Sequence, residues 1–302
     1  MDRLIEDFLQ DCTLRGMTKI TVLHYGYCLK NFLTYLAGKD PVEVNKEILR
    51  GFIEYLKAQG KSQKTVENYF SVLSTFYEFL TFEDHISANP ILPVRKRYLR
   101  RYKDNNDGQA RKLISVDDMA RLINSTMDVR DKAVITLLAK TGVRRHELVE
   151  LDVSDVDFIE NKIRLKPTAK RTNRTVFIDD ECSFILRRWI KVREGMNKKD
   201  IPALFINADG ERLNRSGVYN LVVEAALRVG LHDSQSERLE DHFGPHCCRH
   251  WFCTHLFRNG MRREYIKELR GDSRKEAFDL YNHIDLKELK EAYLACIPQL
   301  GI

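Results

Sequence analysis

The chain has 302 residues, of which 43% are hydrophobic and 31% are charged, and its formal net charge is +6 at pH 7. These proportions are typical of a globular protein that is long enough for two hydrophobic cores. No apolar run approaches the roughly 18 residues of a membrane span, so a membrane protein is excluded. The acidic, amphipathic start of the chain differs from a secretory signal, and seven scattered cysteines favour a reducing compartment. We therefore expect a cytoplasmic protein.

The first part of the chain contains an internal repeat. Residues 16–36 and 60–80 resemble each other, and in both segments apolar residues recur every three or four positions. This period predicts helices, and Thr18 and Ser62 stand where N-caps are expected. The predicted helices of this small domain span residues 2–14, 16–36, 43–58 and 60–80. We expect the domain to end at NPILPV (89–94), because two prolines should stop a helix.

A basic segment follows. Residues 95–113 (RKRYLRRYKDNNDGQARKL) contain eight basic and two acidic residues, an excess equal to the net charge of the whole chain. Their DNNDGQ stretch is turn-prone, which favours a linker between two domains. The linker is open to two interpretations: a solvated hinge, or a strap across a polyanion, since Lys and Arg displace counterions from nucleic acid phosphates.

The remainder, residues 114–302, reads as a mostly helical domain with a small antiparallel sheet. An apolar helix at 131–142 ends at a glycine, and KIRL (162–165) and TVFI (175–178) have strand composition. The polar loop KPTAKRTNR separates these two strands. Further helices are predicted at about 180–196, 214–229, 245–259, 262–270 and 286–297.

The stretch GPHCCRHWFCTH (244–255) raises the question of a metal site. His246 and His250 are four residues apart on a predicted helix and could share a metal. The zincin pattern, however, requires a glutamate directly after the first histidine, and no separate cysteine pair occurs elsewhere in the sequence. Cys247 and Cys248 point away from both histidines and are better interpreted as core residues. We therefore predict no metal and no cofactor.

An anion site explains more of these residues. His246 and Arg249 lie three residues apart on one helical face, and an arginine can bind two phosphate oxygens at once. A second arginine, Arg144, occurs in TGVRRHELVEL (141–151), with Glu147 three residues later as an acidic partner. Near the end of the chain, EAFDLYNHID (276–285) offers Tyr281 as a nucleophile.

Together these motifs resemble those of the tyrosine recombinases, also called the phage integrase family. TGVRRHEL is similar to the family's T-G-x-R-x-x-E-L box, PHCCRH to its H-x-x-R-H box, and LYNHI to the segment around its C-terminal tyrosine. Order and spacing agree, and the resemblance covers nearly the whole chain. GDSRKEAFDLYNHID is most similar to archaeal members. The resemblance implies a SAM-like core-binding domain (1–94), the linker (95–113) and a recombinase domain (114–302).

The resemblance also implies a mechanism. Arg144 and Arg249 would hold a DNA phosphate while Tyr281 attacks it, giving a 3′-phosphotyrosine and a free 5′-hydroxyl without a metal or ATP. The family's hairpin pattern, G-K-G-x-K-x-R, supplies a lysine as the acid. Lys170 is our choice and Lys166 its rival, because KPTAKRTNR does not align cleanly. The resemblance further implies that His246 assists proton transfer, that His250 braces the site and that Glu147 orients Arg144. It also implies DNA binding by the basic residues Arg95, Lys96, Arg97, Arg100 and Arg101.

One position departs from the family pattern. Where the family usually has His or Trp after a glycine, this chain has Asp272 in RGDSR. A carboxylate facing a phosphate would be repelled by it. Asp272 is either protonated beside the anion or turned away to pair with Arg270, Arg274 or an active-site arginine. We prefer the second account.

The expected partner is a double-stranded DNA site, which a dimer or tetramer would bind.

The last helix has an apolar stripe, and two interpretations stay open: it covers its own domain, or it docks on a neighbouring subunit as in the family. The stripe comprises Leu286, Leu289, Tyr293, Ile297 and Leu300. Rival functions are a topoisomerase with the same tyrosine chemistry, a DNA-binding protein without catalysis, and a metal-dependent protein.

Overall fold

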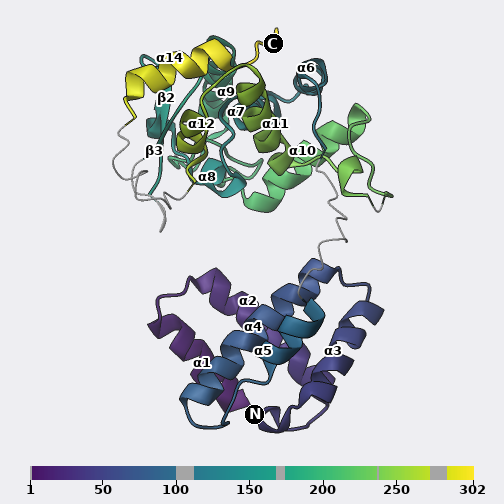
Figure 1. Cartoon of the computed structure of the whole chain (residues 1–302). Coiled ribbons are helices and arrows are strands. Elements are labelled where there is room, and N and C mark those ends of the chain that lie inside the picture. Colours follow the sequence, from purple (N-terminus) through teal and green to yellow (C-terminus); the bar gives the residue numbers. More distant parts are fainter. Residues whose placement is uncertain (1, 100–111, 168–173, 237, 273–283) are drawn as a thin grey trace. The chain divides into compact units, whose positions relative to one another are not determined.

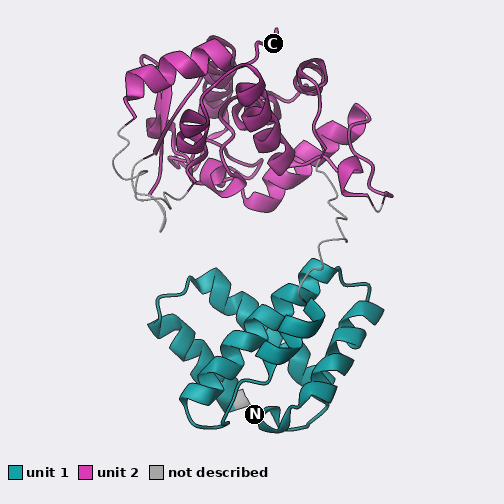
Figure 2. Cartoon of the chain, in the orientation of Figure 1, with its two compact units in different colours: residues 1–107 teal, residues 108–302 magenta. Residues whose placement is uncertain are grey.

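The structure is a computed structural model, and it describes residues 2–99, 112–167, 174–236, 238–272 and 284–302. The chain forms two compact units, Met1–Asp107 and Gly108–Ile302 (Figure 2). In the described residues, no helix is both long and apolar enough to cross a membrane.

The first unit is a helical domain whose four main helices were all predicted. They are α1 (Asp2–Leu14), α2 (Lys19–Leu36), α3 (Lys46–Ala58) and α4 (Gln63–Phe82), with a short 3-10 turn, η1 (Pro41–Glu43), before α3 (Figure 1). The predicted caps are confirmed: the Thr18 hydroxyl accepts from the Thr21 N–H at 3.3 Å, and that of Ser62 from Thr65 at 3.2 Å. Aromatic side chains fill the core between the helices, which follows from their helical spacing.

The expectation that NPILPV ends this domain is wrong. Residues 91–99 are helical, as α5 (Ile91–Val94) and the π-helical turn η2 (Arg95–Leu99). Ile91, Val94 and Leu99 are buried in the core of the first unit. The prolines are tolerated because they lie at the start of a helix, where the first N–H groups have no intrahelical partner. Residues 95–99 therefore pack with the first unit instead of forming the start of a linker.

The second unit is mostly helical and contains a small antiparallel sheet, as predicted. Its strands β1 (Val156–Asp157), β2 (Lys162–Leu165) and β3 (Arg174–Phe177) pair in that order, with Ile163 opposite Val176. Its helices are α6 (Val116–Asn124), α7 (Val129–Thr141), α8 (Arg145–Glu150), α9 (Asp180–Met196), α10 (Arg215–Arg228), α11 (Pro245–Arg258), α12 (Arg263–Arg270) and α14 (Leu286–Cys296); short 3-10 turns are η3 (Val153–Asp155) and η4 (Leu239–Asp241). Helices α6 and α8 were not predicted.

Helix α7 is the centre of the second core. Every residue from Ala133 to Thr141 is buried, and the helix packs against α9 and α11. It ends at Gly142, whose φ of +60° is left-handed. A β-carbon at this position would lie 2.3 Å from the ring of Phe252, so the close packing of α11 requires glycine. This tight turn brings Arg144 to the start of α8, directly beside α11.

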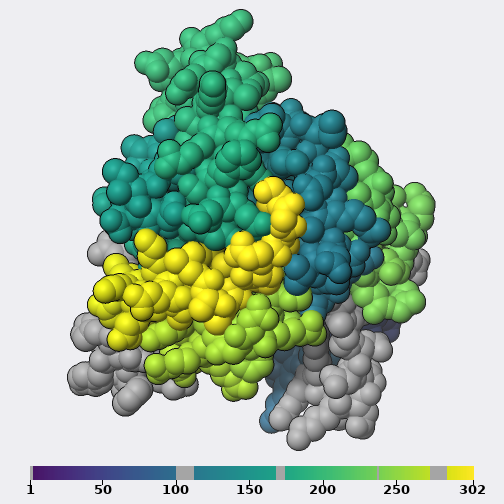
Figure 3. Space-filling model, turned by 90° about the horizontal axis from the view of Figure 1, so that it is seen from above, coloured from purple at the N-terminus to yellow at the C-terminus, as the bar shows by residue number. Residues whose placement is uncertain are grey.

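The last helix, α14, packs on its own domain. Leu289, Tyr293, Ile297 and Leu300 are buried in the second core, whereas Leu286 is 54% exposed and does not belong to the buried stripe. The Tyr293 hydroxyl donates to the carbonyl of Lys140 at 3.0 Å. Figure 3 shows the C-terminal segment, in yellow, lying across the surface of the second unit. Of the two predicted alternatives, this structure contains the self-packed one.

Candidate active site

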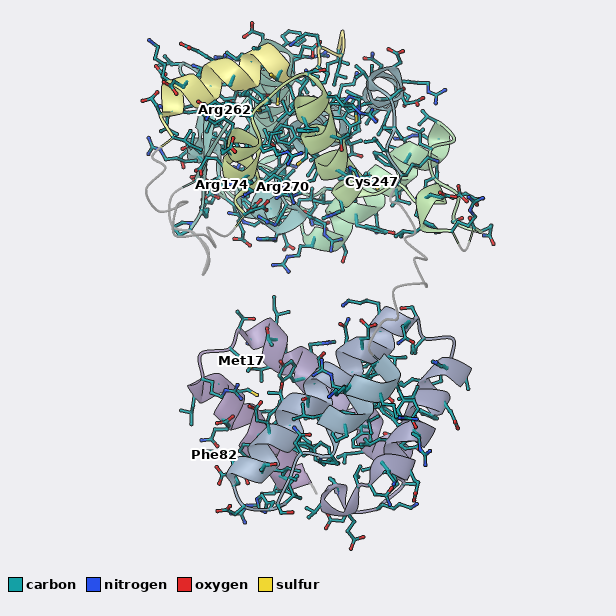
Figure 4. The ribbon with its side chains drawn as sticks, viewed as in Figure 1. Met17, Phe82, Arg174, Cys247, Arg262 and Arg270 are labelled. Atoms are coloured by element: carbon teal, nitrogen blue, oxygen red, sulfur yellow. The ribbon has the colours of Figure 1, made fainter. Side chains whose placement is uncertain are left out.

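Two predicted boxes, more than a hundred residues apart in sequence, meet in the second unit. Arg144 precedes α8 and Arg249 lies on α11, and two further arginines join them from the first residue of β3 and the last of α12. This arginine cluster comprises Arg144, Arg174, Arg249 and Arg270, with the carboxylates Glu147 and Asp272. Figure 4 shows Arg174 and Arg270 near each other where β3 meets α12.

The C-terminal end of α12 fixes three of these guanidinium groups. The Leu269 carbonyl accepts from Arg174 Nε at 3.0 Å. The Arg270 carbonyl accepts from Arg144 Nη1 at 3.1 Å and from Arg249 Nη2 at 2.7 Å. The last carbonyls of a helix lack intrahelical partners and carry the negative end of its dipole, so they attract cations. One helix end therefore gathers arginines from three other elements.

Gly271 makes this close approach possible. Its φ is +63°, and a β-carbon there would lie 2.6 Å from Nη1 of Arg174. Any other residue would be strained in its backbone and would displace the arginine.

Glu147 links two of the arginines. One of its oxygens accepts from the backbone N–H of Arg144 at 2.6 Å, and the other accepts from Nη1 of Arg144 at 3.2 Å and Nη1 of Arg174 at 2.5 Å. Burial raises the pKa of this carboxyl, but Arg174, the Arg144 N–H and the Arg144 side chain together bring it below its ordinary value. Glu147 is therefore ionised at neutral pH and holds Arg144 in place.

Arg249 is the most buried of the predicted phosphate-binding residues. It is 5% exposed and donates to the Gly142 carbonyl at 2.5 Å as well as to the Arg270 carbonyl. Burial, reinforced by the neighbouring charge of Arg144, lowers its pKa to about 10. The side chain remains protonated at neutral pH, so its charge is fixed in a partly desolvated site.

Asp272 pairs with the arginines, as the preferred sequence account expected, but it does not turn away from the site: it faces the two arginines predicted to hold the phosphate. Its Oδ1 atom lies 3.7 Å from Nη2 of Arg144 and 3.7 Å from Nη2 of Arg249. Its Oδ2 atom lies 3.3 Å from Nε of Arg270. The carboxylate is half-buried, with 32% of its side chain exposed.

The two predicted histidines stand beside Arg249 on α11. Both are exposed, and both line a pocket of about 480 Å³ between α11 and α12 together with Arg249 and Arg270. His246 and Arg249 also line a second pocket, together with Arg144. His250 Nδ1 lies 3.0 Å from the Thr254 hydroxyl. No group of three potential metal ligands occurs in the described residues.

Several predicted residues lie outside the described residues, namely Lys170, Tyr281, Arg100 and Arg101. The rival lysine, Lys166, is described, directly after β2. It forms ion pairs with Asp152 and, at 3.7 Å, with Asp155. The hydrogen bond to Asp152 raises the pKa of Lys166. Two carboxylates thus compete with any substrate for this lysine.

The predicted DNA-binding residues that are described lie on η2, in the first unit. Lys96 and Arg97 are exposed. Arg95 is half-buried, and its Nη2 donates to the Ser71 hydroxyl of α4 at 3.1 Å. Two cations of this group are therefore open to a ligand, while Arg95 is partly engaged within its own unit.

Sequence reasoning missed Arg174 and did not place Arg270 beyond its link to Asp272. Arg174 ends the loop KPTAKRTNR, and the family's G-K-G-x-K-x-R pattern also ends in arginine. That final position was therefore a usable signal.

Comparison with known proteins identifies the family of this chain. Residues 109–288 match the phage integrase family, and residues 4–84 match the N-terminal SAM-like domain of phage integrases. The first match covers more than half of the chain, so this protein belongs to the phage integrase family. It is accordingly a tyrosine-type site-specific recombinase, an enzyme that breaks and rejoins DNA.

Particular relatives span the whole chain. It is 28% identical to tyrosine recombinase XerD of Oceanobacillus iheyensis, with 99% of each chain covered. It is 29% identical to tyrosine recombinase XerC of Thermodesulfovibrio yellowstonii, with 96% of this chain and 94% of that one covered. The fold is similar to that of Tn1549 transposon integrase in complex with transposon right end DNA (TM-score 0.72, 18% identity, 95% and 97% covered). It is also similar to a lambda integrase dimer bound to a COC′ core site (TM-score 0.71, 15% identity, 95% and 99% covered).

Proposed function

We propose that Arg144 and Arg249 bind the scissile phosphate of a DNA site and that Tyr281 is the nucleophile. The tyrosine oxygen forms a bond to phosphorus while the bond from phosphorus to the 5′-oxygen breaks. The products are a 3′-phosphotyrosine and a 5′-hydroxyl, and attack by a 5′-hydroxyl reverses the step. Because the covalent intermediate keeps the phosphodiester energy, rejoining needs no ATP.

One observation carries the proposal: two guanidinium groups converge on a single anionic oxygen. Nη2 of Arg144 and Nη2 of Arg249 are each 3.7 Å from Oδ1 of Asp272. Nη1 of Arg144 is held by Glu147 and by the Arg270 carbonyl. Arg249 is held through Nη1 by the Gly142 carbonyl and through Nη2 by the Arg270 carbonyl, so the orientation of both side chains does not depend on the ligand. Such fixed donors stabilise the charge that develops on a phosphate in the transition state.

The 5′-oxygen leaves with a proton, which we assign to Lys170. The engagement of Lys166 with Asp152 and Asp155 supports this choice over its rival. His246 is assigned to proton transfer at the tyrosine, since a histidine titrates near neutral pH. His250 is assigned to bracing the site from the same face of α11. Glu147 positions Arg144 through two hydrogen bonds, one from the Arg144 backbone N–H and one from its Nη1.

Both units are assigned to DNA binding. The first unit serves as the core-binding domain and the second as the recombinase domain. The basic cluster Arg95, Lys96, Arg97, Arg100 and Arg101 contacts the phosphate backbone. Two structural relatives were seen on DNA sites, one of them as a dimer, which supports a dimer or tetramer on DNA for this chain. Archaeal-type membership and a cytoplasmic location stay predictions.

The test is covalent trapping on a library of nicked duplexes with random sequence. Wild-type protein and Tyr281→Phe are incubated with the library in EDTA, and adducts are recovered from denaturing gels and sequenced. We expect 3′-linked adducts that share a sequence motif and that vanish in Tyr281→Phe. Adducts without a shared motif would favour a topoisomerase. Sequence-specific binding without any adduct would favour a DNA-binding protein that lacks catalysis.

A further inference from the structure

Asp272 occupies the position that an anionic ligand of the arginine cluster would take. Its Oδ1 atom is shared between Arg144 and Arg249, the two residues assigned to the phosphate. A phosphate oxygen and a carboxylate oxygen carry similar charge and attract the same guanidinium donors. The two anions therefore compete for the same place.

The contacts of Asp272 are weaker than those that hold the arginines. Its distances of 3.7 Å to Arg144 and Arg249 exceed hydrogen-bond range, whereas Arg249 reaches its two carbonyls at 2.5 and 2.7 Å. Asp272 lies beyond the C-terminal end of α12, and 32% of its side chain is exposed. Its carboxylate can therefore rotate away while the arginines keep their positions.

The carboxylate of Asp272 offsets part of the positive charge of the cluster. Four arginines face Glu147 and Asp272, and Glu147 is committed to Arg144 and Arg174. Without Asp272, the guanidinium groups of Arg144, Arg249 and Arg270 would repel one another across a partly buried site. An internal anion reduces this repulsion until an external one arrives.

We propose that Asp272 is a built-in phosphate mimic, which occupies the anion site of the free enzyme and is displaced by the scissile phosphate. This inference rests on the assignment of Arg144 and Arg249 to the phosphate. In this proposal the carboxylate of Asp272 competes with the DNA phosphate for the arginines. Only DNA that is bound tightly enough to displace the carboxylate reaches them. The residue thus sets a threshold against weakly bound DNA.

The competition predicts a tighter anion site when the carboxylate is neutralised. If Asp272 occupies the site about 90% of the time, its removal strengthens binding of a phosphate about tenfold. Asp272→Asn keeps the size of the side chain and removes its charge. The matched control is Glu264→Gln, which removes the same charge from α12, the helix that precedes Asp272, at an exposed pair with Arg262 outside the cluster.

The experiment is a titration of the full-length protein with inorganic phosphate at constant ionic strength, with chloride as the balancing anion. Binding is read from the rise in the unfolding temperature for wild type, Asp272→Asn, Glu264→Gln and Arg249→Gln. We expect binding in wild type, about tenfold tighter binding in Asp272→Asn, no change in Glu264→Gln and loss in Arg249→Gln. The double variant Asp272→Asn with Arg249→Gln should also lose binding, which locates the gain at the arginines.

The outcomes separate this inference from the function on which it rests. Unchanged or weaker binding in Asp272→Asn, with binding still lost in Arg249→Gln, would overturn the phosphate mimic and leave the anion site intact. If phosphate binding does not depend on Arg249, either in the wild type or in Asp272→Asn, the anion site itself is contradicted. Folding of Asp272→Asn is checked by its unfolding temperature without phosphate.

Discussion

The second unit contains two clusters of buried charge, close together along the chain and opposite in character. The first surrounds Lys140, near the end of α7, whose Nζ donates to Asp179 and Glu181 at 2.5 Å and to the Pro298 carbonyl at 2.8 Å. Glu181 in turn accepts the backbone N–H groups of Leu300 and Gly301. The second is the arginine cluster, which begins four residues later at Arg144.

The Lys140 cluster is closed. Its lysine is fully buried, and its two carboxylates are bound by the lysine and by the end of the chain. The arginine cluster has more positive than negative groups, and part of Arg144 and of Asp272 is exposed. In the Lys140 cluster, backbone N–H groups satisfy the second negative charge, whereas the arginine cluster keeps an excess of positive charge for a ligand.

The largest effect on stability is expected from Lys140→Met. The substitution leaves Asp179 and Glu181 buried without their cation, which should lower the free energy of unfolding by about 3–5 kcal/mol. Urea unfolding measures it. The matched control is Lys199→Met, since Lys199 pairs with Glu211 on the surface and should contribute little. Similar losses of unfolding free energy in Lys140→Met and Lys199→Met would show that the Lys140 cluster does not stabilise the fold more than a surface ion pair.

Glu147→Gln should have an intermediate effect that depends on pH. The folded-state pKa of Glu147 lies below its ordinary value, so its charge stabilises the fold above the unfolded pKa, and this contribution is lost as the pH falls through the folded pKa. We expect Glu147→Gln to be less stable than wild type by about 1–3 kcal/mol at pH 7.

The difference should shrink as the pH falls below about 4.3. Unfolding curves between pH 3 and pH 7 measure it, with the exposed pair member Glu211→Gln as the control. A difference that stays constant across this range would mean that Glu147 acts through shape and not through charge.

Gly271→Ala should have a small effect on stability but a specific effect on the site. Gly230 has a similar φ of +70° with open space around it, so Gly230→Ala reports backbone strain alone. We expect Gly230→Ala to lose about 1 kcal/mol. Gly271→Ala should lose more, because its β-carbon meets Arg174, and its adduct formation should fall about tenfold through misplacement of the arginines. Equal behaviour of the two variants would show that the contact with Arg174 is unimportant.

Local patterns predicted most of the fold. The repeat at 16–36 and 60–80 gave two helices with their caps, because apolar period and capping depend on neighbours in sequence. Helix α8 was missed because six residues are too few to show a period. The prolines at 90 and 93 led to the wrong domain end. A proline that starts a helix cannot be told from one that ends a helix unless the packing of that helix is known.

The site was predictable only where its residues share a motif. Arg144, Glu147 and Arg249 followed from two boxes, and the pairing of Asp272 with arginines followed from charge. The hairpin pattern marks the residue Arg174, but its contacts with Glu147 and with the end of α12 join segments 27 and 95 residues apart, and no local pattern indicates those contacts. Tertiary structure was needed to show that one helix end gathers three arginines.

The most direct test of the central claim compares covalent adduct formation by Arg249→Gln and Lys140→Met. Both variants lose a buried cation of the second unit, and single-turnover rates on a recovered target duplex are expressed per folded molecule. We predict that Arg249→Gln slows adduct formation by about 10²–10³, as loss of one transition-state donor does. Lys140→Met should keep nearly the wild-type rate. Adduct formation by Arg249→Gln at the wild-type rate, or equal losses in both variants, would contradict the account.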